Sequence, residues 1–116
     1  MRKEALITMN DYIDFIFSET KKVFEEVAKE CRAEVRIGPK PNDEKQFSQK
    51  VMGFRIKKIG KEISLNLIIE PDGTGTIYLA PGRSFLEVEY HSGFKNQKEF
   101  EKELIVIAAF LRRHMM

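Results

Sequence analysis

The residues best suited to chemistry are Glu87, Glu89 and His91, which occupy alternate positions in one short stretch of the chain. If this stretch is a β-strand, the three side chains stand on one face, with neighbours about 7 Å apart. Carboxylates and imidazoles bind divalent metal ions when ligands from a neighbouring element converge on the same ion. The pattern therefore favours a solvated strand face that pairs with lysines or arginines, with a metal site at these three residues as the alternative.

No other group of residues favours catalysis or a bound cofactor. Cys31 lies among apolar residues without a companion base in the local sequence, so a buried, unreactive thiol is the simpler interpretation. Gly73 and Gly75 are not followed by the lysine of a phosphate-binding loop. His114 stands beside two arginines at the end of a predicted helix, where the helix dipole favours cations. We therefore expect a protein that is not an enzyme and has no cofactor.

The distribution of charge indicates a binding surface. Residues 36–61 contain eight lysines or arginines and two acidic residues, a net charge of +6, whereas residues 62–91 carry a net charge of −4. The predicted binding residues are cations, a polar side chain and aromatics: Arg55, Lys57, Lys58, Asn66, Tyr78 and Phe85. Our first hypothesis is recognition of another protein by an open sheet face or by the basic segment.

The alternative hypothesis is binding of single-stranded nucleic acid by the same cations and stacking aromatics, in the segment 36–61 and on the sheet face. It predicts an affinity that falls steeply with salt. Glu70, Glu87 and Glu89 are expected on the same face, where they would repel phosphates. This repulsion favours the protein partner.

A helix is predicted near each end of the chain. Thr8 caps the first helix, with Asp11 at its third position. Its apolar residues recur at steps of three and four: Ile13, Ile16, Phe17, Thr20, Phe24, Val27 and Cys31. The second helix spans 97–115, and Asn96 caps it with Glu99 reaching back to the amide of Asn96.

The second helix has an unusual surface, because residues 104–111 are all apolar. A helix that is apolar on all sides needs cover on more than one side. One sheet and one neighbouring helix leave part of it without cover. We therefore predict a homodimer through the helix 97–115.

Alternation of apolar and polar residues predicts strands between the helices. The apolar members are Val35 and Ile37; Met52, Phe54 and Ile56; Ile63, Leu65, Leu67 and Ile69; Ile77 and Leu79; and Leu86, Val88 and Tyr90. Gly60, Gly73 and Gly82 suit tight turns between them. The polar segment 38–50 is expected to be a mobile or functional connection.

The order helix, meander, helix predicts an α+β fold in one domain, 1–116. It is a two-layer sandwich, with the N-terminal and C-terminal helices packed on one face of a four- to five-stranded antiparallel meander. This plan resembles that of frataxin-like sandwiches, and the acidic residues of the first helix resemble their acidic ridge: Asp11, Asp14, Glu19, Glu25, Glu26 and Glu30. The resemblance concerns the fold, so no residue role is carried over.

The length and composition of the chain indicate which class of protein it belongs to. A chain of 116 residues with 42% hydrophobic and 33% charged content is typical of one globular domain. Its single cysteine excludes an internal disulfide and favours a reducing compartment. No stretch reaches about 18 uninterrupted apolar residues, so we expect no membrane span and no signal peptide. The predicted location is cytoplasmic, and the predicted partner is another protein, with nucleic acid as the alternative and no membrane.

Overall fold

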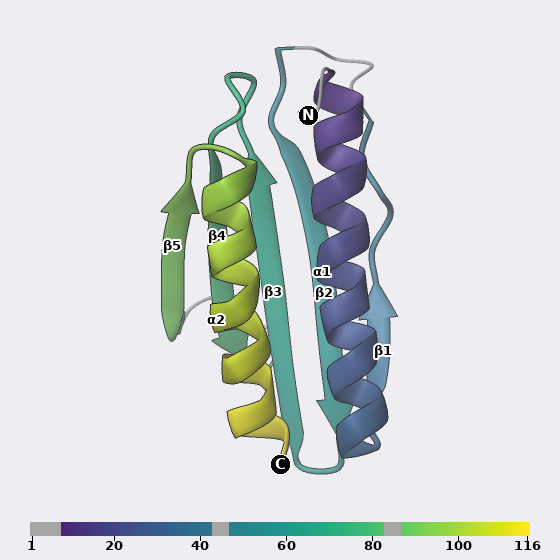
Figure 1. Ribbon diagram of the computed structural model, residues 1–116. Helices are drawn as coiled ribbons and strands as arrows, with labels where there is room; N and C mark the ends of the chain where they lie inside the picture. Colours follow the sequence, from purple (N-terminus) through teal and green to yellow (C-terminus); the bar gives the residue numbers. More distant parts are fainter. Residues whose placement is uncertain (1–7, 43–46, 83–86) are drawn as a thin grey trace.

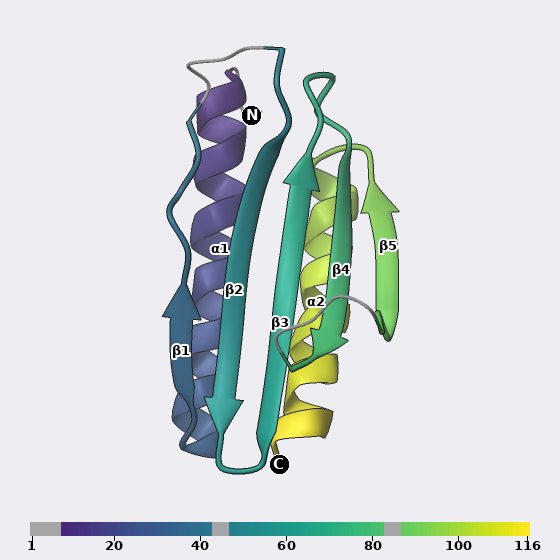
Figure 2. The ribbon, with the colours of Figure 1, turned by 180° about the vertical axis from the view of Figure 1, so that it is seen from behind.

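The computed structural model describes residues 8–42, 47–82 and 87–116 of the chain. Its elements are helix α1 (Met9–Cys31), strands β1 (Glu34–Ile37), β2 (Lys50–Lys58), β3 (Lys61–Ile69), β4 (Gly75–Pro81) and β5 (Tyr90–Phe94), and helix α2 (Gln97–Met115). The strands form one antiparallel sheet in the order β1-β2-β3-β4-β5. Both helices lie side by side on one face (Figure 1), and in the described part of the chain no helix covers the other face (Figure 2). The predicted α+β two-layer sandwich is confirmed.

Both helices begin at the predicted caps. Thr8 Oγ1 accepts a hydrogen bond from the amide of Asp11 at 3.0 Å, and Asn96 Oδ1 accepts one from the amide of Glu99 at 2.9 Å. The carboxylate of Glu99 turns back to the amide of Lys95 at 2.8 Å, one residue earlier than predicted. These side chains satisfy amides that have no partner inside the helix, and such a cap stabilises a helix by about 1 kcal/mol.

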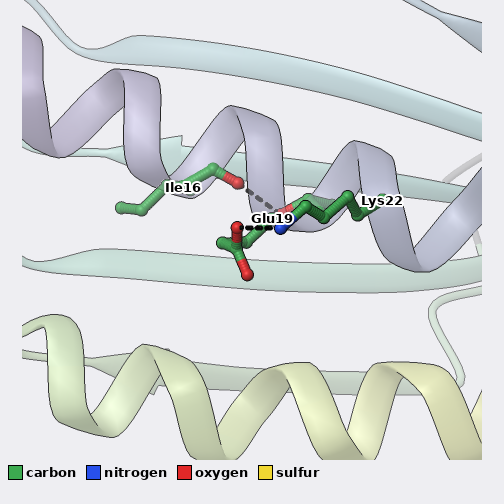
Figure 3. A network of polar contacts seen from close by, with 4 residues as sticks. Ile16, Glu19 and Lys22 are labelled. Atoms are coloured by element: carbon green, nitrogen blue, oxygen red, sulfur yellow. Dashed lines mark hydrogen bonds and ion pairs between the residues drawn. The ribbon is translucent and has the colours of Figure 1, made fainter.

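Helix α1 has a buried side and an exposed side. The buried residues are Ile13, Ile16, Thr20, Phe24, Val27, Ala28 and Cys31. Thr20 is the polar member, and its hydroxyl donates to the carbonyl of Ile16 at 2.7 Å (Figure 3), so it is buried without losing a hydrogen bond. Nearby on the helix, Glu19 and Lys22 form an ion pair of 3.0 Å (Figure 3).

Helices α1 and α2 run parallel (Figure 1) and contact each other near both ends. Near their N-terminal ends, the rings of Phe15 and Phe100 meet edge to face with centroids 6.2 Å apart. Near their C-terminal ends, two guanidinium nitrogens of Arg112 donate to the carboxylate of Glu30 at 2.8 and 2.9 Å. These hydrogen bonds hold the pKa of Glu30 below its ordinary value. The pair is exposed, so it aligns the helices more than it stabilises them.

The core lies between the helices and the sheet. Fully buried residues of the central strands are Met52, Ile56, Leu65, Leu67, Ile69, Ile77 and Leu79. The ring of Phe54 contacts Phe24 of α1 at a centroid distance of 5.5 Å, and Phe94 contacts Phe100 of α2 at 5.1 Å. Each large apolar side chain removed from water contributes about 1.5–3 kcal/mol. Of the described helices, neither is long and apolar enough to cross a membrane.

The last strand begins later than the alternation predicted. The pattern placed a strand over residues 86–91 and ended it at Gly93, whereas β5 spans Tyr90–Phe94 and contains Gly93. Val88, expected to face the core, is exposed before the strand. Leu86, its predicted companion, lies outside the described residues.

Contacts of the inward-facing residues of β5 explain its register. The hydroxyls of Tyr90 and Ser92 donate to the carboxylate of Glu103 on α2, at 2.7 and 3.0 Å. The ring of Phe94 occupies the space beside Gly75 on β4, where a side chain would otherwise stand. Each partner lies on another element, so local alternation could not indicate it.

Replacing Gly75 by alanine should destabilise the domain, because the added methyl group would lie 2.1 Å from Cζ of Phe94. Overpacking of this kind costs about 1–3 kcal/mol. Gly53→Ala is the matched control, since its methyl group would lie 3.7 Å from Asn66 Oδ1, an ordinary contact, and alanine is the better strand residue. Urea denaturation measures both variants. A free energy of unfolding for Gly75→Ala within about 0.5 kcal/mol of the wild type would contradict this account.

Tyr12 on α1 has a buried hydroxyl group that lacks a hydrogen bond among the described residues. Burial, and secondly the negative charge of Glu99, raise the pKa of Tyr12 to about 12. The native state therefore holds the neutral phenol more strongly than the unfolded chain does.

The variant Tyr12→Phe should be neutral or stabilising near pH 7, by up to about 1 kcal/mol, because it removes a buried hydroxyl that lacks a partner. An unfolded tyrosine ionises near pH 10, so between about pH 10 and 12 the unfolded chain loses this proton while the native state keeps it. Wild-type stability should fall across this interval more steeply than that of the variant. Urea denaturation at stepped pH makes the comparison, and parallel stability curves would refute it.

Candidate functional site

The strand register organises the open face of the sheet, which Figure 2 shows from outside. Outward-facing residues of neighbouring strands stand opposite one another in rows across the strands. Two rows cross the middle of the face: Arg36–Arg55–Ser64–Ala80 and Gly53–Asn66–Tyr78–His91. Arginines, an amide and aromatic rings are thereby gathered from five strands that are far apart in the sequence.

A cleft of about 270 Å³ lies where these rows meet strands β1, β2 and β3. We call it the open-face cleft and define it by Arg36, Gly38, Gly53, Arg55, Ser64 and Asn66. It is hollow because neither glycine has a side chain to fill it. The amide of Gly38 donates to the carbonyl of Gly53 at 2.8 Å, so main chain forms its floor. Glycine inside a strand commonly marks a place where another molecule approaches the backbone closely.

Ser64 and Ala80 face outward by register but are buried. An outward position on the open face would ordinarily expose Ser64 to solvent. Its hydroxyl instead donates to the main-chain carbonyl of Gly82, beyond the end of β4. This part of the open face is therefore covered, and the exposed binding surface is smaller than predicted.

Two arginines dominate the charge of the open-face cleft. Arg36 and Arg55 stand directly opposite each other on β1 and β2. Arg55 Nε lies 3.2 Å from a carboxylate oxygen of Glu62, whereas Arg36 is exposed and pairs with no carboxylate in the described chain. Like charges directly opposite each other destabilise a sheet by roughly 0.2–1 kcal/mol. An anion bound between the two side chains would remove that cost.

Aromatic rings continue the site across β4 and β5. The rings of Tyr78 and His91 are stacked, with centroids 5.8 Å apart and planes inclined by 8°. They lie in the same row as Gly53 and Asn66, so the cleft and the ring pair form one surface. Phe85, which was predicted to join this surface, lies outside the described residues.

Most described cations of the basic segment are engaged inside the domain. Lys40 lies 2.6 Å from the carboxylate of Asp14 on α1. Lys50 is buried, and its ammonium donates to the carbonyl of Ser48 at 3.0 Å. Arg55 is paired with Glu62, as above. These contacts reduce the positive charge that the segment offers to a partner.

Two further lysines hold the end of α2. Lys58 Nζ donates to the main-chain oxygen of Met115 at 3.1 Å, and Lys61 Nζ donates to that of Met116 at 2.7 Å. Cations are favoured there because the last carbonyls of a helix have no partner within it and carry negative partial charge. Lys58 therefore lies on the helix-covered side of the sheet. Lys57 is exposed on the open face, opposite Glu34 and Glu62.

The structure does not gather the predicted metal ligands. Glu87 and Glu89 precede β5, while His91 lies within it. Glu89 lies 3.2 Å from Nε2 of His114, which is at the end of α2, and so turns away from His91. Among the described residues, no three histidine, cysteine or acidic side chains lie close enough together to hold a metal ion.

Sequence reasoning missed the residues that shape the cleft. Arg36 was counted as charge and assigned to a strand, and Gly53 was passed over within a regular alternation of apolar residues. A glycine at an outward-facing strand position was the available signal. Its meaning depends on Gly38, which only the pairing of β1 with β2 brings beside it.

Acidic residues of α1 take part in several ion pairs. Asp14 contacts Lys40, Glu19 contacts Lys22, and Glu30 contacts Arg112. These carboxylates join α1 to its surroundings or to itself. Their contacts give no separate support to the acidic ridge suggested by the resemblance to frataxin-like sandwiches.

The variant Lys58→Met should lower the free energy of unfolding by about 1 kcal/mol, because it removes a charged donor from the end of α2 while keeping the length of the side chain. Lys57→Met is the matched control and should stay within about 0.5 kcal/mol of the wild type. Thermal denaturation followed by circular dichroism compares them. Equal melting temperatures for the two variants would show that the Lys58 contact contributes nothing.

Comparison with known proteins adds no relative to this description. No protein-family model, no curated protein and no solved structure matches the chain.

Proposed function

We propose that this domain is a non-catalytic binding module that recognises another protein through the open face of its sheet. The observation that carries this proposal is the open-face cleft beside the stacked rings of Tyr78 and His91. Paired strands fix the backbone positions of the arginines and Asn66, and the rings of Tyr78 and His91 are stacked on each other, before a partner arrives. Such preorganisation lowers the entropic cost of association.

The contacts of the cations favour a protein over a nucleic acid. A single strand of nucleic acid is bound by a continuous positively charged groove with stacking side chains. On the open face the exposed cation Lys57 stands between Glu34 and Glu62, and Lys58 and Lys61 are engaged at the end of α2. The cations of the described open face therefore form no continuous track, and the pair Arg36 and Arg55 at the open-face cleft suits one anionic group better than a polyanion.

We further propose that α2 contributes a second, weaker contact surface for a homodimer through the helix 97–115. Ile105 is 73% exposed and Val106 is 39% exposed on its outer side. Two side chains of this size cover little of the roughly 1,200–2,000 Å² that a stable interface buries. The patch is therefore a weaker candidate than the open face. We expect both contacts to operate in the cytoplasm, because the single cysteine is buried and free.

A capture experiment from a lysate of the source organism distinguishes the two faces. The full chain is used as bait, with Gly53→Tyr to fill the open-face cleft and Ile105→Lys as the matched control on α2. We expect a protein partner whose affinity falls at least about tenfold with Gly53→Tyr and is unchanged with Ile105→Lys. Melting temperatures verify that both variants fold.

The opposite pattern, with binding lost in Ile105→Lys and retained in Gly53→Tyr, would assign recognition to α2 and overturn the proposal for the sheet. Light scattering on the same proteins tests the homodimer. A dimer mass for the wild type and a monomer mass for Ile105→Lys would support self-association, whereas a monomer mass for both would refute it.

A further inference from the structure

We infer that the open-face cleft binds the carboxylate of an aspartate or glutamate side chain in an extended segment of the partner protein. This inference rests on the proposed function, because it specifies what the partner presents to the open face. The segment would cross the strands from β1 toward β4, so that a second side chain reaches Tyr78.

The positive charge of the cleft suits a carboxylate. Arg36 and Arg55 occupy directly opposite positions on adjacent strands, and Arg36 pairs with no carboxylate in the described chain. Guanidinium groups match carboxylates geometrically, since two nitrogen donors face two oxygen acceptors. Arg55 Nε lies 3.2 Å from a carboxylate oxygen of Glu62, and this charge attraction keeps the guanidinium near the edge of the cleft without a hydrogen bond at Nε among the described residues.

The shape of the cleft suits a single side chain of an extended segment. Because Gly38 and Gly53 lack side chains, an incoming group can reach main chain beside the two arginines, one row further along β1 and β2. Asn66 lies opposite Gly53 and presents an amide at the wall of the cleft, where it can pair with the main chain of an extended segment. A single side chain with its adjoining peptide groups suits such a space better than a flat protein surface does.

The spacing of the strands predicts the direction and the sequence of the segment. Adjacent strands are about 4.8 Å apart and Tyr78 lies one row away from the arginines, so a carboxylate between β1 and β2 lies about 14 Å from Tyr78 on β4. An extended chain rises about 3.3 Å per residue, and alternate side chains face the same way. The acidic residue and a flat or apolar residue that contacts Tyr78 should therefore be separated by about four positions.

Selection from a random peptide library displayed on phage, with the full chain as target, tests this inference. The recovered peptides should share an acidic residue and, about four positions away, a flat or apolar residue. A synthetic peptide from the selection is then compared with its Asp→Asn or Glu→Gln counterpart by calorimetry. We expect the amide counterpart to bind about tenfold or more weakly.

A double-mutant cycle tests whether the acid meets Arg36. The variant Arg36→Gln should weaken the acidic peptide by a similar factor and should leave the amide counterpart unaffected, because the interacting pair is then already broken. Lys57→Gln is the matched control, since Lys57 is an exposed cation on the same face that stands between two glutamates. It should change the affinity less than about twofold.

The remaining outcomes separate this inference from the proposed function. Peptides that lack an acid, but lose affinity with Gly53→Tyr, would overturn the carboxylate site and leave the open face as the binding surface. Peptides that carry an acid without a flat or apolar residue at the expected spacing would support the carboxylate site and overturn the crossing direction. Failure of every peptide to bind the open face, together with salt-sensitive binding of oligothymidylate, would overturn both in favour of nucleic acid.

Discussion

Burial of one apolar sheet face beneath two parallel helices is the constraint on which the rest of the structure depends. Phe24 and Phe100, one from each helix, pack against Phe54 and Phe94 of the sheet, and this layer excludes water along the domain. The requirement reaches beyond the core itself. Strand β5 adopts a register that places Phe94 beside Gly75, although its preceding residues alternate equally well.

Closing this sandwich uses much of the positive charge in the basic segment 36–61. Lys58 and Lys61 reach from the β2–β3 hairpin to the last main-chain oxygens of α2, and Lys40 reaches α1. Their role is to satisfy groups at the ends and edges of the helices, where polar atoms have no partner inside the helix. A charge run that suggested a binding surface is thus largely structural. The arginines of the open face stand out because helix packing does not require them.

The open face belongs to a stable sheet, but several of its own residues weaken the pairing of the strands. Opposed arginines and strand glycines both weaken a sheet, by a fraction of a kcal/mol to about 1 kcal/mol each. The burial of the opposite face readily offsets such a cost. Residues that lower stability at one place, beside a preformed cleft and a pair of stacked rings, are consistent with the proposed role of this face in recognition.

The sequence by itself determined the features that depend on near neighbours along the chain. The caps at Thr8 and Asn96, the tight turns at Gly60 and Gly73, and the inward-facing residues of β2 and β3 follow from hydrogen bonds and side-chain alternation within a few residues. These features were sufficient to predict the two-layer fold, because an element with one apolar face has to bury it.

Only the tertiary structure decided where β5 begins, which lysines are engaged and where the cleft lies. Lys57 and Lys58 are adjacent in sequence, yet the pleat sends one to the open face and the other to α2. Gly38 and Gly53 form one hollow because β1 pairs with β2 across a long connection. Each of these outcomes depends on a partner from a distant part of the chain, and the identity of such a partner is set by packing and strand register, which no local pattern contains.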